Sequence, residues 1–162
     1  MCSEDDYLLE IEGVLVNEFR ICQSLFECMK DERKALSAAD IESLYFLVEK
    51  REDILEELEQ FETRREKLVN DFASQLHFRL ANPRLSDCLA SLSKPPLERI
   101  GRLCEGIVAL QDSLYNLGEW NHALANAMLR RDESAQALLL NLYPPAHKYR
   151  PPVLTQDIKN LI

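Results

Sequence analysis

Residues 32–68 read ERKALSAADIESLYFLVEKREDILEELEQFETRREKL, and this stretch decides the fold. It begins in the last turns of one amphipathic helix, whose apolar pattern weakens at Leu36. Ser37 and Asp40 then form a Ser-x-x-Asp signal for the start of a second helix. Because a turn this short joins antiparallel neighbours, the stretch predicts a helical hairpin.

Apolar residues recur at steps of three and four on both sides of this turn. Before the turn they predict a helix over about residues 4–36. It starts after Ser3, which forms a variant of the capping box with Asp6. After the turn, a seam with a spacing near 3.5 predicts a helix over about residues 38–80 and a left-handed supercoil.

Charged residues interrupt the seam of the second helix. Arg51, Glu62 and Arg65 occupy positions where apolar side chains are expected. A seam with fewer apolar side chains buries less surface, so the sequence predicts a bundle that is thin or locally splayed at these levels.

A third long helix is predicted over about residues 96–142, after the breaker Ser93-Lys94-Pro95-Pro96. Its heptad seam continues through Arg131, and Gly118 leaves open whether the helix is continuous or kinked. A short helix is expected within residues 84–92. From Tyr143 onward the chain is rich in proline, so the tail 143–162 is expected to be extended or docked.

These patterns define an all-α fold class. We expect one domain over residues 1–142, an antiparallel bundle of three long helices with coiled-coil-like packing. A fourth, shorter helix is compatible with the sequence, and a Pro-rich C-terminal tail follows the bundle.

Composition excludes several classes of partner. The net charge is −9 and the isoelectric point is about 4.9, so a phosphate backbone would repel this chain and nucleic acid is not expected as a partner. No apolar run is long enough for membrane insertion, and the acidic N-terminus is unlike a signal peptide. The five cysteines lack metal-ligand spacing, which indicates reduced thiols and a cytoplasmic location.

The sequence offers little for catalysis. Glu119 and His122 form one Glu-x-x-His unit, but a di-iron bundle needs two such units and two further glutamates. We therefore expect a solvent-exposed Glu–His pair, no metal, no cofactor and no enzyme activity.

Asn121 occupies a seam position of the third helix, where leucine is expected. One interpretation is that the seam receives a partner at this level. The other is that Asn121 is hydrogen-bonded locally or lies near solvent, and the sequence does not choose between the two.

One family combines these features in the same order. The quoted stretch has an acidic-plus-Ala-Leu helix end, an Asp that opens the next helix, then Lys, leucines and an acidic-basic continuation. The residues are Glu32, Ala35, Leu36, Asp40, Leu44, Lys50, Leu55, Leu58, Glu59 and Arg64. Over residues 5–142 the chain resembles the flagellar export chaperones of the FlgN type. Asn126 and Leu129 match the second half of the family's Asn-containing segment, whereas Ala123 replaces its first Asn.

The resemblance implies a cytoplasmic, non-enzymatic chaperone of the flagellar type III export system. Such chaperones bind C-terminal helical segments of hook–filament junction (hook-associated) proteins and deliver them to the export apparatus. The family's usual client-binding region maps to about residues 119–142. The candidate client-binding residues are seam side chains in and next to this region: Leu117, Asn121, Leu124, Met128, Arg131, Ala135 and Leu138.

Other functions stay open on the sequence alone. A coiled-coil adaptor or scaffold of an unrelated pathway predicts a fully satisfied core without an exposed apolar groove. A bundle enzyme or metal carrier predicts bound metal. A chaperone for a virulence effector is disfavoured because that class mixes strands with helices. Self-association into a homo-oligomer is compatible with every one of these functions.

Overall fold

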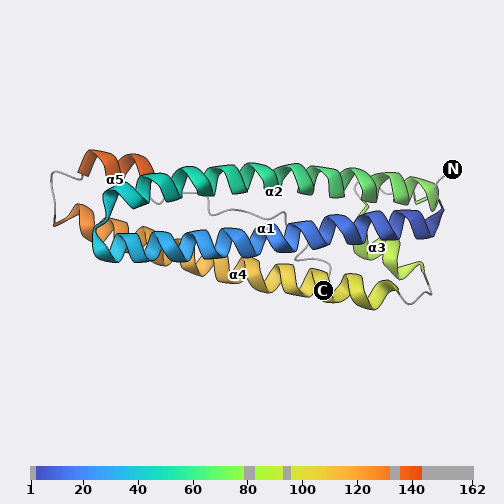
Figure 1. Ribbon diagram of the computed structural model, residues 1–162. Helices are drawn as coiled ribbons and strands as arrows, with labels where there is room; N and C mark the ends of the chain where they lie inside the picture. The colour runs from blue at the N-terminus through green and yellow to red at the C-terminus, as the bar shows by residue number, and fades with distance from the viewer. Residues whose placement is uncertain (1–2, 79–82, 93–95, 132–135, 144–162) are drawn as a thin grey trace. The chain divides into compact units, whose positions relative to one another are not determined.

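The computed structural model describes residues 3–78, 83–92, 96–131 and 136–143. These residues form the helices α1 (Glu4–Ala38), α2 (Ile41–Gln75), α3 (Leu85–Ala90), α4 (Pro96–Leu129) and α5 (Gln136–Leu142), shown in Figure 1. Because the described residues contain no strand, the predicted all-α class is confirmed. α3 confirms the short helix expected within residues 84–92, and α4 is continuous through Gly118.

Contacts divide the chain into two compact units. Unit 1 contains the described residues up to Cys22 together with Glu57–Ala109. Unit 2 contains Gln23–Glu56 and the described residues from Leu110 onward. The expectation of a single domain over residues 1–142 stays a prediction, and each unit is therefore described by itself.

The core of unit 1 joins side chains from α1, α2, α3 and α4. Fully buried members include Ile11, Phe72, Cys88 and Ile100, one from each of these helices. The ring of Tyr7 stacks on Phe72 with centroids 5.4 Å apart. Burial of these apolar side chains is the main favourable term for a unit of this kind.

α4 comes close to α1 within unit 1. A Cβ atom on Gly106 would lie 2.9 Å from Cε2 of Phe19, so a larger residue would displace the ring. On the same two helices, Arg99 of α4 forms an ion pair with Glu12. Residue numbers rise together in these contacts, so the two helices run in the same direction.

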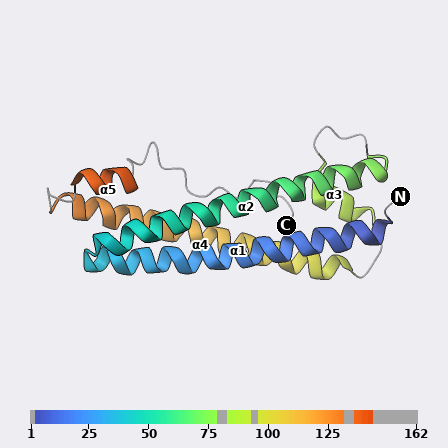
Figure 2. The ribbon, with the colours of Figure 1, turned by 45° about the horizontal axis from the view of Figure 1, so that its top comes forward.

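The core of unit 2 joins α1, α2, α4 and α5. Its fully buried members include Leu36, Leu44, Ala125 and Leu139, again one from each helix. Tyr143, which directly follows α5, belongs to the same cluster and is only 2% exposed. In both units α2 runs back alongside α1, as the hairpin requires (Figures 1 and 2).

The predicted start of α1 is confirmed. The Ser3 backbone N–H donates to Oδ2 of Asp6 (2.8 Å), and the Asp6 N–H donates to Oγ of Ser3 (3.2 Å). These reciprocal bonds are the capping box, and they satisfy two backbone donors at the helix end that carries a positive partial charge.

The turn between α1 and α2 differs from the prediction in its cap. Asp40 is the N-cap of α2, and its carboxylate accepts the Ser43 N–H (3.0 Å) and hydroxyl (2.6 Å). Ser37 is still helical and donates its hydroxyl to the Arg33 carbonyl. The start signal was therefore placed three residues early. Ala39, with a φ of 55°, makes the left-handed turn in which the Asp40 N–H returns to the Ala35 carbonyl.

The predicted third helix over 96–142 is wrong in its C-terminal part. α4 ends at Leu129, where the Arg131 N–H closes a turn on the Met128 carbonyl (2.9 Å), and α5 begins only at Gln136. The segment after Leu129 reads RRDES, which has no apolar side chain to bury at the seam. The energetic reason to continue one amphipathic helix is therefore lost at this point. The predicted tail beyond Tyr143 lies outside the described residues.

Arg51 and Arg65, two of the charged seam residues, are buried in ion pairs inside the bundle. Nε of Arg65 lies 2.9 Å from Oε1 of Glu18 in unit 1, and both side chains are at most 3% exposed. In unit 2, Nη1 of Arg51 lies 2.8 Å from Oε2 of Glu32. Burial raises the pKa of both carboxyl groups, and the paired guanidinium opposes that rise. The expectation of a splayed bundle at these levels is corrected accordingly.

All four described cysteines are free and buried: Cys22, Cys28, Cys88 and Cys104. Burial raises the pKa of the Cys22 thiol from its ordinary value of 9.0 to about 12, and nearby Glu18 and Glu62 add to the rise. Thiolate is the reactive form, so these thiols are expected to resist alkylation at pH 8 until the protein unfolds.

The raised pKa of the Cys22 thiol also predicts that the folded protein loses stability at alkaline pH. Above pH 9 an unfolded Cys22 releases its proton while the folded one retains it until about pH 12. Unfolding therefore releases a proton in this window, and stability falls as pH rises, by at most about 1.4 kcal/mol per pH unit. Urea unfolding of wild type and Cys22→Ala between pH 8 and 10.5 measures how the free energy of unfolding depends on pH. An equal slope for both proteins would contradict the prediction.

Candidate binding surface

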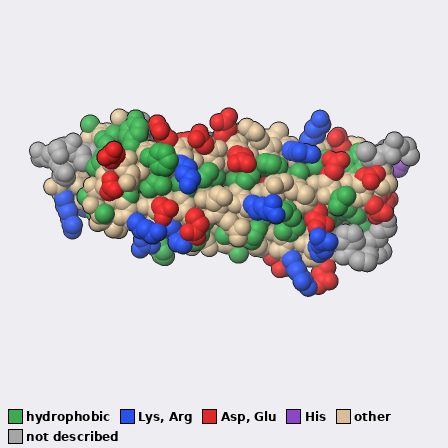
Figure 3. Space-filling model, in the orientation of Figure 1, with side chains coloured by type: hydrophobic (Ala, Val, Ile, Leu, Met, Phe, Trp, Pro, Cys, Tyr) green, Lys and Arg blue, Asp and Glu red, His purple; other side chains and the backbone are tan. Residues whose placement is uncertain are grey.

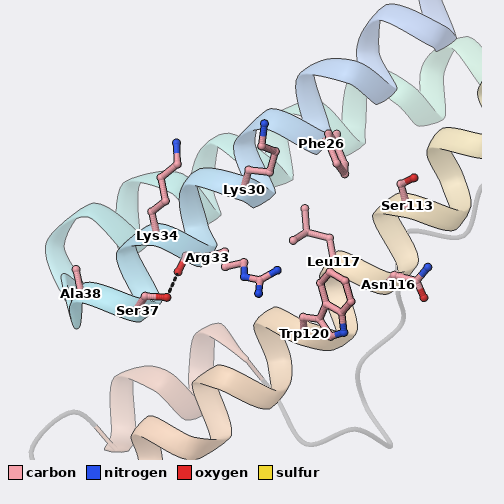
Figure 4. Close-up of a pocket in the computed structure, with 10 residues that line it drawn as sticks. All are labelled: Phe26, Lys30, Arg33, Lys34, Ser37, Ala38, Ser113, Asn116, Leu117 and Trp120. Atoms are coloured by element: carbon pink, nitrogen blue, oxygen red, sulfur yellow. Dashed lines mark hydrogen bonds between the residues drawn. The ribbon is translucent and has the colours of Figure 1, made fainter.

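A groove of about 830 Å³ lies between α1 and α4 in unit 2 (Figure 4). Two helix faces line it, one from each helix. The α1 face contributes Phe26, Lys30, Arg33, Lys34, Ser37 and Ala38, and the α4 face contributes Ser113, Asn116, Leu117 and Trp120. Both sets follow helical spacing, so each helix turns one continuous stripe toward the groove.

The groove is apolar at its base and aromatic at its walls. Leu117 is 4% exposed and closes the base, whereas the indole of Trp120 is 59% exposed at the wall. Phe26 is half-buried on the opposite helix. Figure 4 shows the Leu117 and Trp120 side chains pointing from α4 toward α1. An aromatic surface that is left this open is typical of a site that binds a partner.

The rim of the groove is basic. The guanidinium carbon of Arg33 lies 5.0 Å from the centre of the Trp120 ring, a cation–π contact. Lys30 pairs with Glu27 (3.0 Å) and Lys34 with Asp31 (2.8 Å), both one turn away on α1. In Figure 4 Arg33 points toward α4, and the ammonium groups of Lys30 and Lys34 point away from it.

A second groove of about 590 Å³ lies between α2 and α5, also in unit 2. It is lined by Ile41, Glu42, Tyr45, Phe46, Glu49 and Leu138. Tyr45 and Phe46 are 50% and 66% exposed. Figure 3 shows hydrophobic side chains at the surface over α5 and the first turns of α2, next to acidic ones. This groove is therefore apolar with an acidic rim, the opposite charge to the first.

The seven predicted client-binding residues do not share one surface. Leu117 lines the α1–α4 groove and Leu138 lines the α2–α5 groove. Leu124 and Met128 are half-buried against the core of unit 2, and Arg131 is exposed just after α4. Ala135 lies outside the described residues. Their role in client binding stays a prediction.

Asn121 is buried at 1% exposure and contacts α1. Its Nδ2 donates to the Met29 backbone carbonyl at 2.8 Å, whereas its Oδ1 is buried without a donor among the described residues. A buried amide that bonds a neighbouring helix fixes the register of the two helices, so Asn121 positions α4 against α1.

The predicted exposure of the Glu119–His122 pair is half wrong. Glu119 is exposed, but His122 is 8% exposed, and its Nδ1 lies 3.1 Å from Nδ2 of Asn126. Within residues 3–78, 83–92, 96–131 and 136–143, no three His, Cys, Asp or Glu side chains group as metal ligands.

The sequence did not single out the α1 side of the first groove. Phe26, Arg33 and Trp120 were not among the predicted client-binding residues. One signal was available, because Trp120 is the single tryptophan of the chain and follows Leu117 at helical spacing. Which face of α1 meets it depends on how the helices pack, and no local pattern encodes that.

The fold and its surfaces define a class: a helical protein with two open apolar grooves at the surface of unit 2. The model of one family, described as FlgN protein, matches residues 7–147. This chain therefore belongs to the FlgN family, whose members act as flagellar export chaperones and bind flagellar proteins. No curated protein and no solved structure matches the chain. Among the described residues, no helix has both the length and the apolar character that crossing a bilayer requires.

Proposed function

We propose that this chain binds the C-terminal helical segments of hook–filament junction proteins in the cytoplasm and delivers them to the flagellar export gate. Family membership supports the chaperone role. The observation that carries the proposal is the open groove between α1 and α4, whose base is Leu117 and whose wall is Trp120. The chaperone needs no catalytic residues for this role.

An amphipathic helix is the natural occupant of such a groove. From Phe26 to Ala38 the α1 wall is about 18 Å long, at roughly 1.5 Å of rise per residue, which is just over three turns. A client helix laid along it would place apolar anchors at i, i+3, i+4 and i+7. Sequestering such a segment prevents its self-association, and folding on binding keeps the complex releasable.

The predicted client-binding residues enter this proposal with different roles. Leu117 would contact the client directly at the base of the groove. Leu124 and Met128 are half-buried one and two turns beyond Trp120 on α4, and Arg131 is exposed just after the helix. Leu138 would serve a client segment that also reaches the α2–α5 groove. Asn121 would act by holding α4 in register.

A plain coiled-coil adaptor is the alternative. It predicts a core that satisfies its own apolar surface, without an open groove. Two apolar grooves in unit 2, together with the exposed Trp120 and Phe46, favour the chaperone.

The test is titration of the full chain with fluorescein-labelled C-terminal peptides of the junction proteins encoded in the same genome. We expect micromolar or tighter binding by fluorescence anisotropy. Trp120→Ala should weaken it by about tenfold or more, because truncating an aromatic anchor that the bound client covers typically has an effect of this size. Tyr115→Ala is the matched control, since Tyr115 is 51% exposed on α4 but does not line the groove.

Absence of binding to every junction peptide would overturn the proposed function. Equal losses with Trp120→Ala and Tyr115→Ala would show that the client binds elsewhere. A peptide of the same composition in scrambled order controls for non-specific apolar binding.

A further inference from the structure

We propose that the α1–α4 groove selects client helices that carry carboxylates along one edge, and that Arg33 and Lys34 form ion pairs with those carboxylates. This inference rests on the proposed function, because it specifies the chemistry of the client that the groove accepts. It starts from an unusual distribution of charge in unit 2.

The groove is basic in an acidic protein. The chain holds 28 Asp and Glu residues against 19 Lys and Arg, yet the groove lining has three cations and no acid. A random patch of this surface would be more acidic than basic. Because a charged rim around an apolar base sets both the orientation and the choice of partner, the occupant should be negative where it meets α1.

Arg33 has the freedom to take a new partner. Within the described ranges it forms no ion pair, and its guanidinium is held over the Trp120 ring at 5.0 Å. A guanidinium that lies over an indole still has N–H donors in its own plane, where a carboxylate can accept two of them. A client that covers Trp120 would therefore bring its edge directly to Arg33.

Lys34 and Lys30 can exchange partners at little cost. Lys34 pairs with Asp31, and both side chains are more than half exposed. Lys30 pairs with Glu27, and these two side chains are 44% and 65% exposed. Exposed pairs one turn apart on a helix contribute little to stability, so a client carboxylate can displace either acid. The spacing of Lys30, Arg33 and Lys34 on one helix face matches carboxylates placed at successive turns of a client.

The experiment uses two synthetic peptides of about 18 residues, or roughly five turns, without tryptophan. They share the same leucine face and differ only in carrying Glu or Lys on its edges. Trp120 is the single tryptophan, so its emission reports occupancy of the groove in the full chain. We expect the Glu peptide to shift the Trp120 emission to the blue and to bind less tightly as salt rises. The Lys peptide should bind at least about tenfold more weakly.

Two matched double charge reversals test whether the preference for the Glu peptide comes from Arg33 and Lys34. Arg33→Glu/Lys34→Glu should weaken the Glu peptide by at least about tenfold and reduce its preference over the Lys peptide. Arg64→Glu/Lys67→Glu makes the same change in charge on exposed residues of α2 in unit 1, and should change affinity less than about twofold. Circular dichroism checks that both variants keep their helices.

The outcomes separate this inference from the proposed function. If junction peptides bind equally to wild type and to Arg33→Glu/Lys34→Glu, the inference falls and the proposed function stands. If the Glu peptide binds as described but no junction peptide does, the proposed function falls and the groove chemistry stands. If both synthetic peptides bind alike, the inference is wrong. A Trp120 shift that depends on protein concentration alone would also overturn it, because a second copy would then occupy the groove.

Discussion

Arg65→Met will destabilise the protein by about 3–5 kcal/mol, because it leaves the Glu18 carboxylate buried without its partner. Nε of Arg65 donates to both Glu18 oxygens, at 2.9 and 3.2 Å. Glu18 is fully buried, so water cannot replace the guanidinium. Urea unfolding followed by circular dichroism measures the loss.

The double variant Glu18→Leu/Arg65→Met separates loss of the charge pair from loss of packing. Replacing both members of a buried pair by apolar side chains of similar size is often neutral, so we expect most of the stability to return. Arg102→Met is the surface control, because Arg102 and Glu98 are about three-quarters exposed, and its effect should stay below about 1 kcal/mol. A Glu18–Arg65 pair that behaves like this surface pair would contradict the structure.

Tyr143→Ala is the second large prediction, with an expected loss of about 3–5 kcal/mol from the core of unit 2. The Tyr143 ring is buried with Leu139 and Leu44, and its hydroxyl donates to Oε2 of Glu32 at 2.7 Å. The same Glu32 oxygen accepts from Arg51. Truncation therefore leaves a cavity and removes a hydrogen bond from a buried carboxylate.

Tyr143→Phe separates the two contributions. It keeps the ring in place and removes only the hydroxyl, so the expected loss is about 1–3 kcal/mol, in the range for a buried hydrogen bond to a charged group. Hydrogen exchange of α5 should accelerate more in Tyr143→Ala than in Tyr143→Phe. If both variants unfolded like wild type, Tyr143 would not anchor α5 to α1.

Local signals were enough to predict the long helices and the starts of α1 and α4. The Ser3–Asp6 capping box was visible because both partners lie within one turn. The second cap was displaced because Ser37 and Asp40 are both good N-cap residues, and only the tertiary arrangement chooses Asp40. The end of α4 at Leu129 was missed because the heptad pattern in the sequence continues past Leu129 through Arg131.

Long-range partners could not be predicted from local patterns. Arg65 lies 47 positions from Glu18, and Tyr143 lies 111 positions from Glu32. The sequence therefore showed charged residues in a seam without their counterparts, and it showed Tyr143 only as the start of a Pro-rich tail. The candidate site could be predicted only in part for the same reason. Leu117 belonged to a predicted seam, whereas Arg33 and Trp120 come into contact only when α1 packs against α4.

We propose that this FlgN-family chain holds a client helix in the groove of unit 2. Hydrogen–deuterium exchange of the full chain, with and without a junction-protein C-terminal peptide, tests it most directly. We expect the peptide to slow exchange in residues 26–38 of α1 and 113–128 of α4, and to leave exchange in α3 unchanged. Unchanged exchange in both segments at saturating peptide, or protection confined to unit 1, would contradict it.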